Sequence, residues 1–144
     1  MMEALPPRRI GRSILAVLVG MVVTIAVTLA TDEMLHRIGV FPPWGASMGG
    51  FDGALLLATI YRTVYGVLGS YITAWLAPYR PMGHAMVGGA IGLAVSILGA
   101  AVTWNKGAAF GPHWYPLALV VLALPTAWVG GKLRVRQLGM DAPQ

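Results

Sequence analysis

Residues 53–77 read GALLLATIYRTVYGVLGSYITAWLA and contain a single charged side chain, Arg62. A helix of about 20 mostly apolar residues, rising about 1.5 Å per residue, crosses the hydrocarbon core of a bilayer, which is about 30 Å thick. This run is therefore long enough and apolar enough to span a membrane. It also places one permanent cation inside the span, and the rest of the chain has to accommodate that charge.

Three further apolar runs have similar length, so four spans are predicted: residues 13–31, 53–77, 82–104 and 114–131. Prolines lack an amide donor and restrict the residue before them, and they mark the boundaries of these runs: Pro6, Pro7, Pro42, Pro43, Pro78, Pro81, Pro112 and Pro116. The first run exceeds the apolar region of a signal peptide, about 7 to 15 residues, so we expect an uncleaved helix. The sequence predicts an all-α fold: one transmembrane domain over residues 1–144, built as a four-helix bundle with an outer loop at about residues 34–52.

The composition agrees with a membrane protein. Hydrophobic residues make up 57% of the chain, charged residues only 10%, and the mean hydropathy is +0.71, whereas about a quarter of the residues of a soluble domain are charged. Cysteine is absent, which excludes disulfides, thiolate metal sites and cysteine nucleophiles. The formal net charge of +5 has to be interpreted from where the basic residues lie.

The basic residues lie mostly on one side of the predicted bundle. That side holds the residues before the first span, in the turn after the second and beyond the fourth: Arg8, Arg9, Arg12, Arg80, Lys132, Arg134 and Arg136. The other side has Arg37 and Lys106, together with the acidic residues Asp32, Glu33 and Asp52. Lys and Arg in short connections favour the cytoplasmic side, where they also meet anionic lipid. We therefore expect both termini in the cytoplasm and no nucleic-acid partner.

Arg62 has a candidate partner on the first helix. The helical rise places Arg62 about 24 Å and Asp32 about 30 Å above the inner ends of their spans, so they differ in depth by about one turn. Glu33 is the alternative partner. Polar residues at three- or four-residue steps form a stripe on each helix: Thr59, Arg62, Thr63, Gly66, Ser70 and Thr73 on one, and Thr24, Thr28, Thr31 and Asp32 on the other. With the flanking tyrosines, whose hydroxyls donate and accept hydrogen bonds, the candidate binding residues are Arg62, Asp32, Tyr61, Tyr65, Thr28 and Thr59.

Three interpretations of Arg62 stay open at this point. A central arginine costs about 2.5 to 3.5 kcal/mol on insertion scales and each apolar residue returns about 0.3 to 0.6 kcal/mol, so the helix inserts even with Arg62 unpaired. Paired with Asp32, Arg62 can act as a clamp that sets the register of two helices. It can also form an anion or proton site facing a cavity, or extend towards the membrane surface without a partner.

The third span carries small residues at every fourth position: Gly88, Gly92, Ser96 and Ala100. Such a ribbon allows another backbone to approach closely. We expect it to serve helix packing inside the bundle, with a face for a homo-oligomer as the alternative.

Catalytic and metal-binding patterns are weak. Asp32 and Glu33 point about 100° apart on a helix, which is a poor geometry for a catalytic pair. The glycines at residues 45–53 lack the lysine of a phosphate-binding loop. The histidines fall on both sides of the predicted bundle without the spacing of a helical metal site. We therefore expect no enzyme, no metal and no cofactor.

Four stretches, ATDEMLHRIGVFPPW, IYRTVYGVLGSYITAWLAP, PMGHAMVGGAIG and WYPLALVVLALPTAWVGGKL, resemble small four-helix bacterial inner-membrane proteins to which no activity is attached. The resemblance implies a multi-pass protein of the bacterial inner membrane and transfers no site. The function we expect is binding or passage of a small solute or lipid through a cavity of the bundle or of an oligomer. The alternative is a noncatalytic accessory or scaffold subunit of a larger membrane complex. Membrane lipid is an expected partner in both cases.

Overall fold

The computed structural model describes residues 9–139. Pro6, Pro7 and Arg8, named above for a boundary and for the charge asymmetry, lie outside the described residues. Residues 9–139 are all-α. The long helices are α1 (Ile10–Arg37), α2 (Asp52–Leu76), α3 (Pro81–Thr103) and α4 (Trp114–Gln137), and a short 3₁₀ helix, η1 (Gly107–Phe110), lies between the last two.

Each of these four helices is long and apolar enough to cross a membrane, which confirms that part of the prediction. α2 and α3 begin and end within one residue of the expected spans, whereas α1 continues to Arg37 and α4 to Gln137. The added turns of α1 contain an ion pair between Glu33 and Arg37, whose side chains meet one turn apart at 2.6 Å. Basic side chains in the last turn of α4 interact favourably with the helix dipole. The first outer loop is consequently shorter than expected, at residues 38–51.

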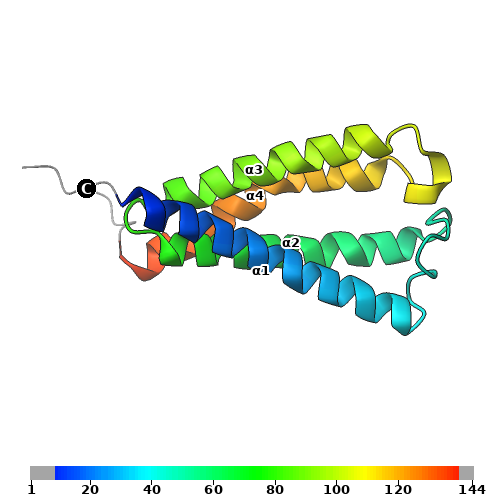
Figure 1. Cartoon of the computed structure of the whole chain (residues 1–144), viewed down its shortest axis with the longest axis horizontal. Helices are drawn as coiled ribbons and strands as arrows, with labels where there is room; N and C mark the ends of the chain where they lie inside the picture. Colours follow the sequence, from blue (N-terminus) through cyan, green and yellow to red (C-terminus); the bar gives the residue numbers. More distant parts are fainter. Residues whose placement is uncertain (1–8, 140–144) are drawn as a thin grey trace, which may run out of the picture.

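The four helices form two antiparallel hairpins, α1–α2 and α3–α4 (Figure 1). α2 and α4 pack closely against each other, α3 packs along α4, and α1 contacts mainly α2. The start of α1, the α2–α3 turn and the end of α4 lie together at what we call the basic end. The two longer loops lie at the opposite, loop end, towards which the hairpins diverge (Figure 1).

Glycines set the distance between the helices where they cross. A Cβ added at Gly69 of α2 would lie 1.8 Å from Thr24 Oγ1 of α1, and one added at Gly130 of α4 would lie 2.5 Å from the carbonyl oxygen of Val67 of α2. Real Cβ atoms do not approach other atoms so closely, because protein interiors are close-packed. The absence of a side chain at these positions therefore permits the observed helix separations.

The loop end is held by a small buried cluster. Leu35 and Phe41 pack with Ala58 and Tyr61 of α2, and the amide of Phe41 donates to the Leu35 carbonyl at 3.1 Å. This arrangement folds the start of the first outer loop back onto the helices. It buries the aromatic ring of Tyr61 beside the position of Arg62.

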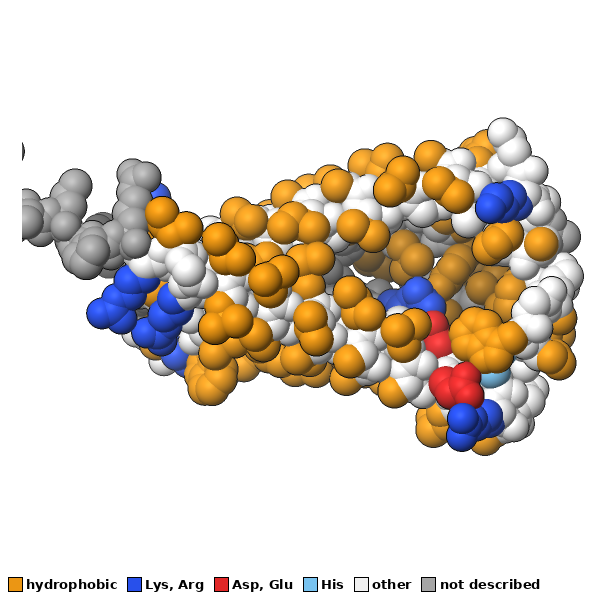
Figure 2. All heavy atoms as spheres, viewed as in Figure 1, with side chains coloured by type: hydrophobic (Ala, Val, Ile, Leu, Met, Phe, Trp, Pro, Cys, Tyr) orange, Lys and Arg blue, Asp and Glu red, His pale blue; other side chains and the backbone are white. Residues whose placement is uncertain are grey.

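The outside of the bundle is apolar along the length of the helices, and basic side chains gather at the basic end (Figure 2). Large side chains such as Val121 and Leu98 are 70% and 64% exposed. At most 22% of the most apolar segment of any of the four helices is buried inside the structure. Soluble proteins rarely expose apolar surface on this scale, so the described part of the chain is compatible with a membrane protein.

Candidate binding cleft between the helical hairpins

Arg62 and Asp32 form an ion pair between α2 and α1. Arg62 Nη2 donates to Asp32 Oδ2 at 2.6 Å, and the hydroxyl of Tyr61 donates to Asp32 Oδ1. The side chain of Asp32 is 9% exposed and that of Arg62 is 31% exposed. The carboxylate is thus enclosed between two donors, while part of the Arg62 side chain remains open.

Glu33, the alternative partner, faces elsewhere. Its carboxylate accepts hydrogen bonds from Arg37 Nε at 2.6 Å and from Trp44 Nε1 at 3.0 Å, on the exposed side of α1. Neighbouring helical residues point about 100° apart, so only one of the two acids can face α2. The structure assigns that role to Asp32.

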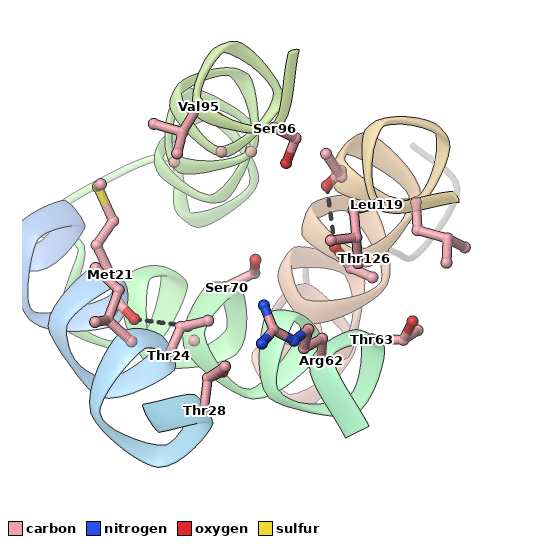
Figure 3. Close-up of a pocket in the computed structure, with 18 of the residues that line it drawn as sticks. Met21, Thr24, Thr28, Arg62, Thr63, Ser70, Val95, Ser96, Leu119 and Thr126 are labelled. Carbon is pink, nitrogen blue, oxygen red and sulfur yellow. Dashed lines mark hydrogen bonds between the residues drawn. The ribbon is translucent and has the colours of Figure 1, made fainter. Parts of the chain in front are cut away.

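A cleft of about 460 Å³ lies between the two hairpins and is lined by residues of all four helices. Arg62 and Asp32 are both on its wall. Figure 3 shows Arg62 extending from α2 towards the middle of the space, with Thr28 contributed by α1 and Ser96 by α3. The space-filling view shows the hollow between α1 and α3, with basic and acidic side-chain atoms inside it (Figure 2).

The cleft wall is mainly apolar around the charged pair. Ile25 and Leu29 of α1, Val95 of α3, and Leu119 and Leu122 of α4 line it. Its size falls within the range of about 300 to 1,000 Å³ that small-molecule pockets occupy. An apolar cleft with one charged group and several hydroxyls suits a ligand that has both an apolar and a polar part.

The hydroxyls of the wall differ in whether they are already engaged. Thr24 donates to the carbonyl of Gly20 at 2.9 Å and Thr126 to that of Ala123 at 2.9 Å. Thr28, Ser70 and Ser96 come from three different helices and make no side-chain hydrogen bond to another described residue. Arg62 Nε is buried and likewise has no hydrogen-bond partner within residues 9–139.

The six residues proposed from sequence divide between the cleft and its surroundings. Arg62, Asp32 and Thr28 line the cleft. Tyr61 does not line the cleft, and its hydroxyl donates a hydrogen bond to Asp32. Tyr65 meets Thr31 Oγ1 through its hydroxyl at 2.9 Å. Thr59 is buried and donates to the Leu55 carbonyl at 2.9 Å. Tyr65 thus links α2 to α1, Thr59 bonds within its own helix, and neither residue lines the cleft.

The small residues of α3 are arranged differently from the expected packing ribbon. Gly88, Gly92 and Ser96 line the cleft, and a Cβ added at either glycine would meet nothing within 4 Å. Ala100 is buried. The close approach to α4 occurs at Gly89, where an added Cβ would lie 2.3 Å from the Cβ of Ala127. A one-residue difference rotates the contact by about 100° around the helix, which the spacing of small residues alone cannot resolve.

Sequence reasoning did not identify the contribution of α4 to the cleft. Leu119, Leu122, Ala123 and Thr126 line it, but the fourth span is apolar on every side, so its pattern indicates no preferred inward face. Thr126 was the one available signal, because it is the only serine or threonine within that run. Ser70, already part of the polar stripe on the second span, also lines the cleft.

Within residues 9–139, no group of three or more His, Asp or Glu side chains is arranged to hold a metal ion. Comparison of the chain with protein-family models, with curated proteins and with solved structures finds no match.

Proposed function

We propose that this chain is a multi-pass protein of the bacterial inner membrane that binds, and passes across its cleft, a small amphipathic solute or lipid. The observation that carries the proposal is the placement of the Arg62–Asp32 pair on the wall of a mainly apolar cleft formed by four helices. Charged groups within membrane segments characteristically mark ligand or ion pathways. A pair that served only as a register clamp would need no adjoining cavity.

The proposed orientation has the basic end in the cytoplasm. Arg9, Arg12, Arg80, Lys132 and Arg134 all belong to segments that meet at this end (Figure 1). The excess of basic residues there supports a cytoplasmic location under the positive-inside rule. The loop end then faces the periplasm, and Arg62, near the middle of α2, lies close to the bilayer midplane, where many transporters bind their substrates.

The proposal excludes catalysis and includes no metal or cofactor. Asp32 is enclosed by Tyr61 and Arg62, and the remaining polar groups on the wall are hydroxyls without a neighbouring base. A noncatalytic accessory subunit is the second candidate. The exposed apolar surface outside the bundle favours it, because such a surface suits another membrane protein as well as lipid.

Two matched substitutions on α3 test the cleft. A Cβ at Gly92 and one at Gly99 both meet open space, but only Gly92 lines the cleft. Gly92→Leu fills the cleft, and Gly99→Leu adds the same side chain outside it. We expect native mass spectrometry of protein released from nonionic detergent to find a retained solute or lipid on the wild type and on Gly99→Leu, and none on Gly92→Leu.

Equal retention by Gly92→Leu, or no retained molecule on any of the three proteins, would contradict the proposal. The accessory role predicts the opposite pattern. In that case Gly99→Leu would release a copurifying membrane protein while Gly92→Leu would retain it.

A further inference from the structure

We infer that the ligand of the cleft is an amphipathic organic anion, whose oxyanion binds Arg62 and whose apolar chain lies along the cleft, and that Asp32 acts as an internal counter-ion that weakens its binding. This inference rests on the proposed function and specifies the ligand class of the same site. It follows from the asymmetry of the ion pair, from the polar groups at one depth and from the shape of the apolar wall.

The ion pair presents its cation to the cleft. Both oxygens of Asp32 accept a hydrogen bond, one from Tyr61 and one from Arg62, and the side chain is 9% exposed. A cationic ligand would find no open edge of the carboxylate. The guanidinium carries five N–H donors, and Asp32 engages Nη2 only. Nε is buried. An oxyanion can therefore be bound by the remaining donors of Nη1 and Nη2, in the geometry that guanidinium groups favour for carboxylate and phosphate.

Further hydrogen-bond donors lie at about the same depth in the bundle as Arg62. Arg62 is 14 residues from the end of α2 at Leu76, and Ser96 is 15 residues from the start of α3 at Pro81. At about 1.5 Å per residue these positions are about 21 Å and about 22 Å from the basic end. Thr28 lies one turn from Asp32 on α1. The unengaged hydroxyls of Ser96 and Thr28 thus lie near the level of the guanidinium, on two other helices that line the cleft (Figure 3).

The apolar part of the wall suits a chain. Lining residues on α1 extend from Gly20 to Asp32, a length of about 18 Å along the helix. One leaflet of a bilayer provides about half of the 30 Å hydrocarbon core, so the cleft has about the length of an acyl chain. Its opening between α1 and α3 (Figure 2) faces the surroundings of the helices, and in a membrane an amphiphile would reach it from the bilayer.

A bound oxyanion and Asp32 would share one guanidinium. Like charges at such short range repel strongly in a poorly solvated site, and the effect on affinity is about tenfold or more. The inference therefore predicts opposite effects for the two members of the pair. Asp32→Asn should tighten anion binding, whereas removing the charge of Arg62 should abolish the preference for anions.

The test uses a thiol placed in the cleft. Because the chain lacks cysteine, Val95→Cys introduces a single thiol of similar size on the apolar part of the cleft wall, and Gly99→Cys introduces one outside the cleft on the same helix. Both proteins are reconstituted in phosphatidylcholine bilayers and alkylated with a small maleimide. The probes are decanoate, decanol, decyltrimethylammonium and acetate.

We expect decanoate to slow alkylation of Val95→Cys by about tenfold at concentrations at which the other three probes have no effect. Alkylation of Gly99→Cys should be unchanged by all four. Adding Asp32→Asn should lower the decanoate concentration needed by about tenfold or more. The double substitution Asp32→Asn with Arg62→Met leaves no unpaired buried charge, and it should remove the difference between decanoate and decanol.

The outcomes distinguish failure of the proposed function from failure of the ligand assignment. If Val95→Cys is not alkylated at all, or if no probe protects it, the proposed function fails. If decanol or decyltrimethylammonium protects as well as decanoate, the cleft binds ligand but the assignment of an anion is wrong. Protection by acetate at the same concentration would mean that a free oxyanion suffices and would overturn the assignment of an amphiphile. Weaker decanoate protection after Asp32→Asn would refute the counter-ion role.

Discussion

The Arg62–Asp32 pair allows a quantitative prediction about stability, because its members differ in burial. Arg62→Met would leave the Asp32 carboxylate, 9% exposed, with Tyr61 as its remaining donor. Removing one partner of a buried ion pair costs about 3 to 5 kcal/mol, and we expect a loss in that range. The methionine fills a similar volume, so the loss reports the uncompensated charge more than a cavity.

Asp32→Asn has a smaller expected effect. It leaves an arginine side chain that is 31% exposed and lines the cleft, where it can be hydrated. The asparagine can still accept the hydrogen bond from Tyr61. The expected loss is about 1 to 3 kcal/mol, the usual range for a lost charge-assisted hydrogen bond. The double substitution should be more stable than the sum of the single losses implies, with a coupling energy of about 1 to 3 kcal/mol.

The assay is reversible unfolding in mixed micelles with increasing sodium dodecyl sulfate, followed by the loss of helical circular dichroism. The wild type, the two single variants and the double variant form a double-mutant cycle, and all four are measured in the same micelle composition. Losses that add within about 0.5 kcal/mol would show that the two residues do not interact. A larger loss for Asp32→Asn than for Arg62→Met would show that leaving the buried carboxylate without its cation is not the larger cost in stability.

Two further predictions concern orientation and helix crossing. A membrane-impermeant thiol reagent added to intact cells should label Ala46→Cys in the first outer loop and should label Gln137→Cys at the end of α4 only after permeabilisation; the reverse pattern would invert the topology. Gly69→Ala should lower the free energy of unfolding by about 1 to 3 kcal/mol, because the new Cβ would lie 1.8 Å from Thr24 Oγ1. Gly92→Ala, whose new Cβ meets open space, should raise the free energy of unfolding by up to about 1 kcal/mol through helix propensity. Equal shifts in the thermal unfolding temperatures of the two variants would show that the Gly69 crossing is not tight.

The extent of the helices was largely predictable, and the surroundings of Arg62 were predictable only in part. The ends of α2 and α3 are marked by prolines and by changes in hydropathy that act locally. The turns of α1 past residue 31 bury Leu35 against Phe41 and α2, a contact between distant segments that hydropathy alone does not reveal. Likewise, the polar stripe on the second span indicated an inward face, but it did not indicate that Thr59 would be engaged by its own helix.

The sequence by itself determined that the chain forms four apolar helices of membrane-spanning length and that one cation and an acid on the neighbouring helix differ in depth by about one turn. These properties follow from hydropathy and helical rise, which depend only on residues close together in the chain. Only the tertiary structure decided that Asp32 is the acid, that Gly89 approaches α4, and that Gly92, Ser96 and Thr126 meet Arg62 around one cleft. Those outcomes depend on how each helix is rotated against its neighbours. In helices that are apolar on nearly every side, that rotation is set by packing between segments distant in sequence.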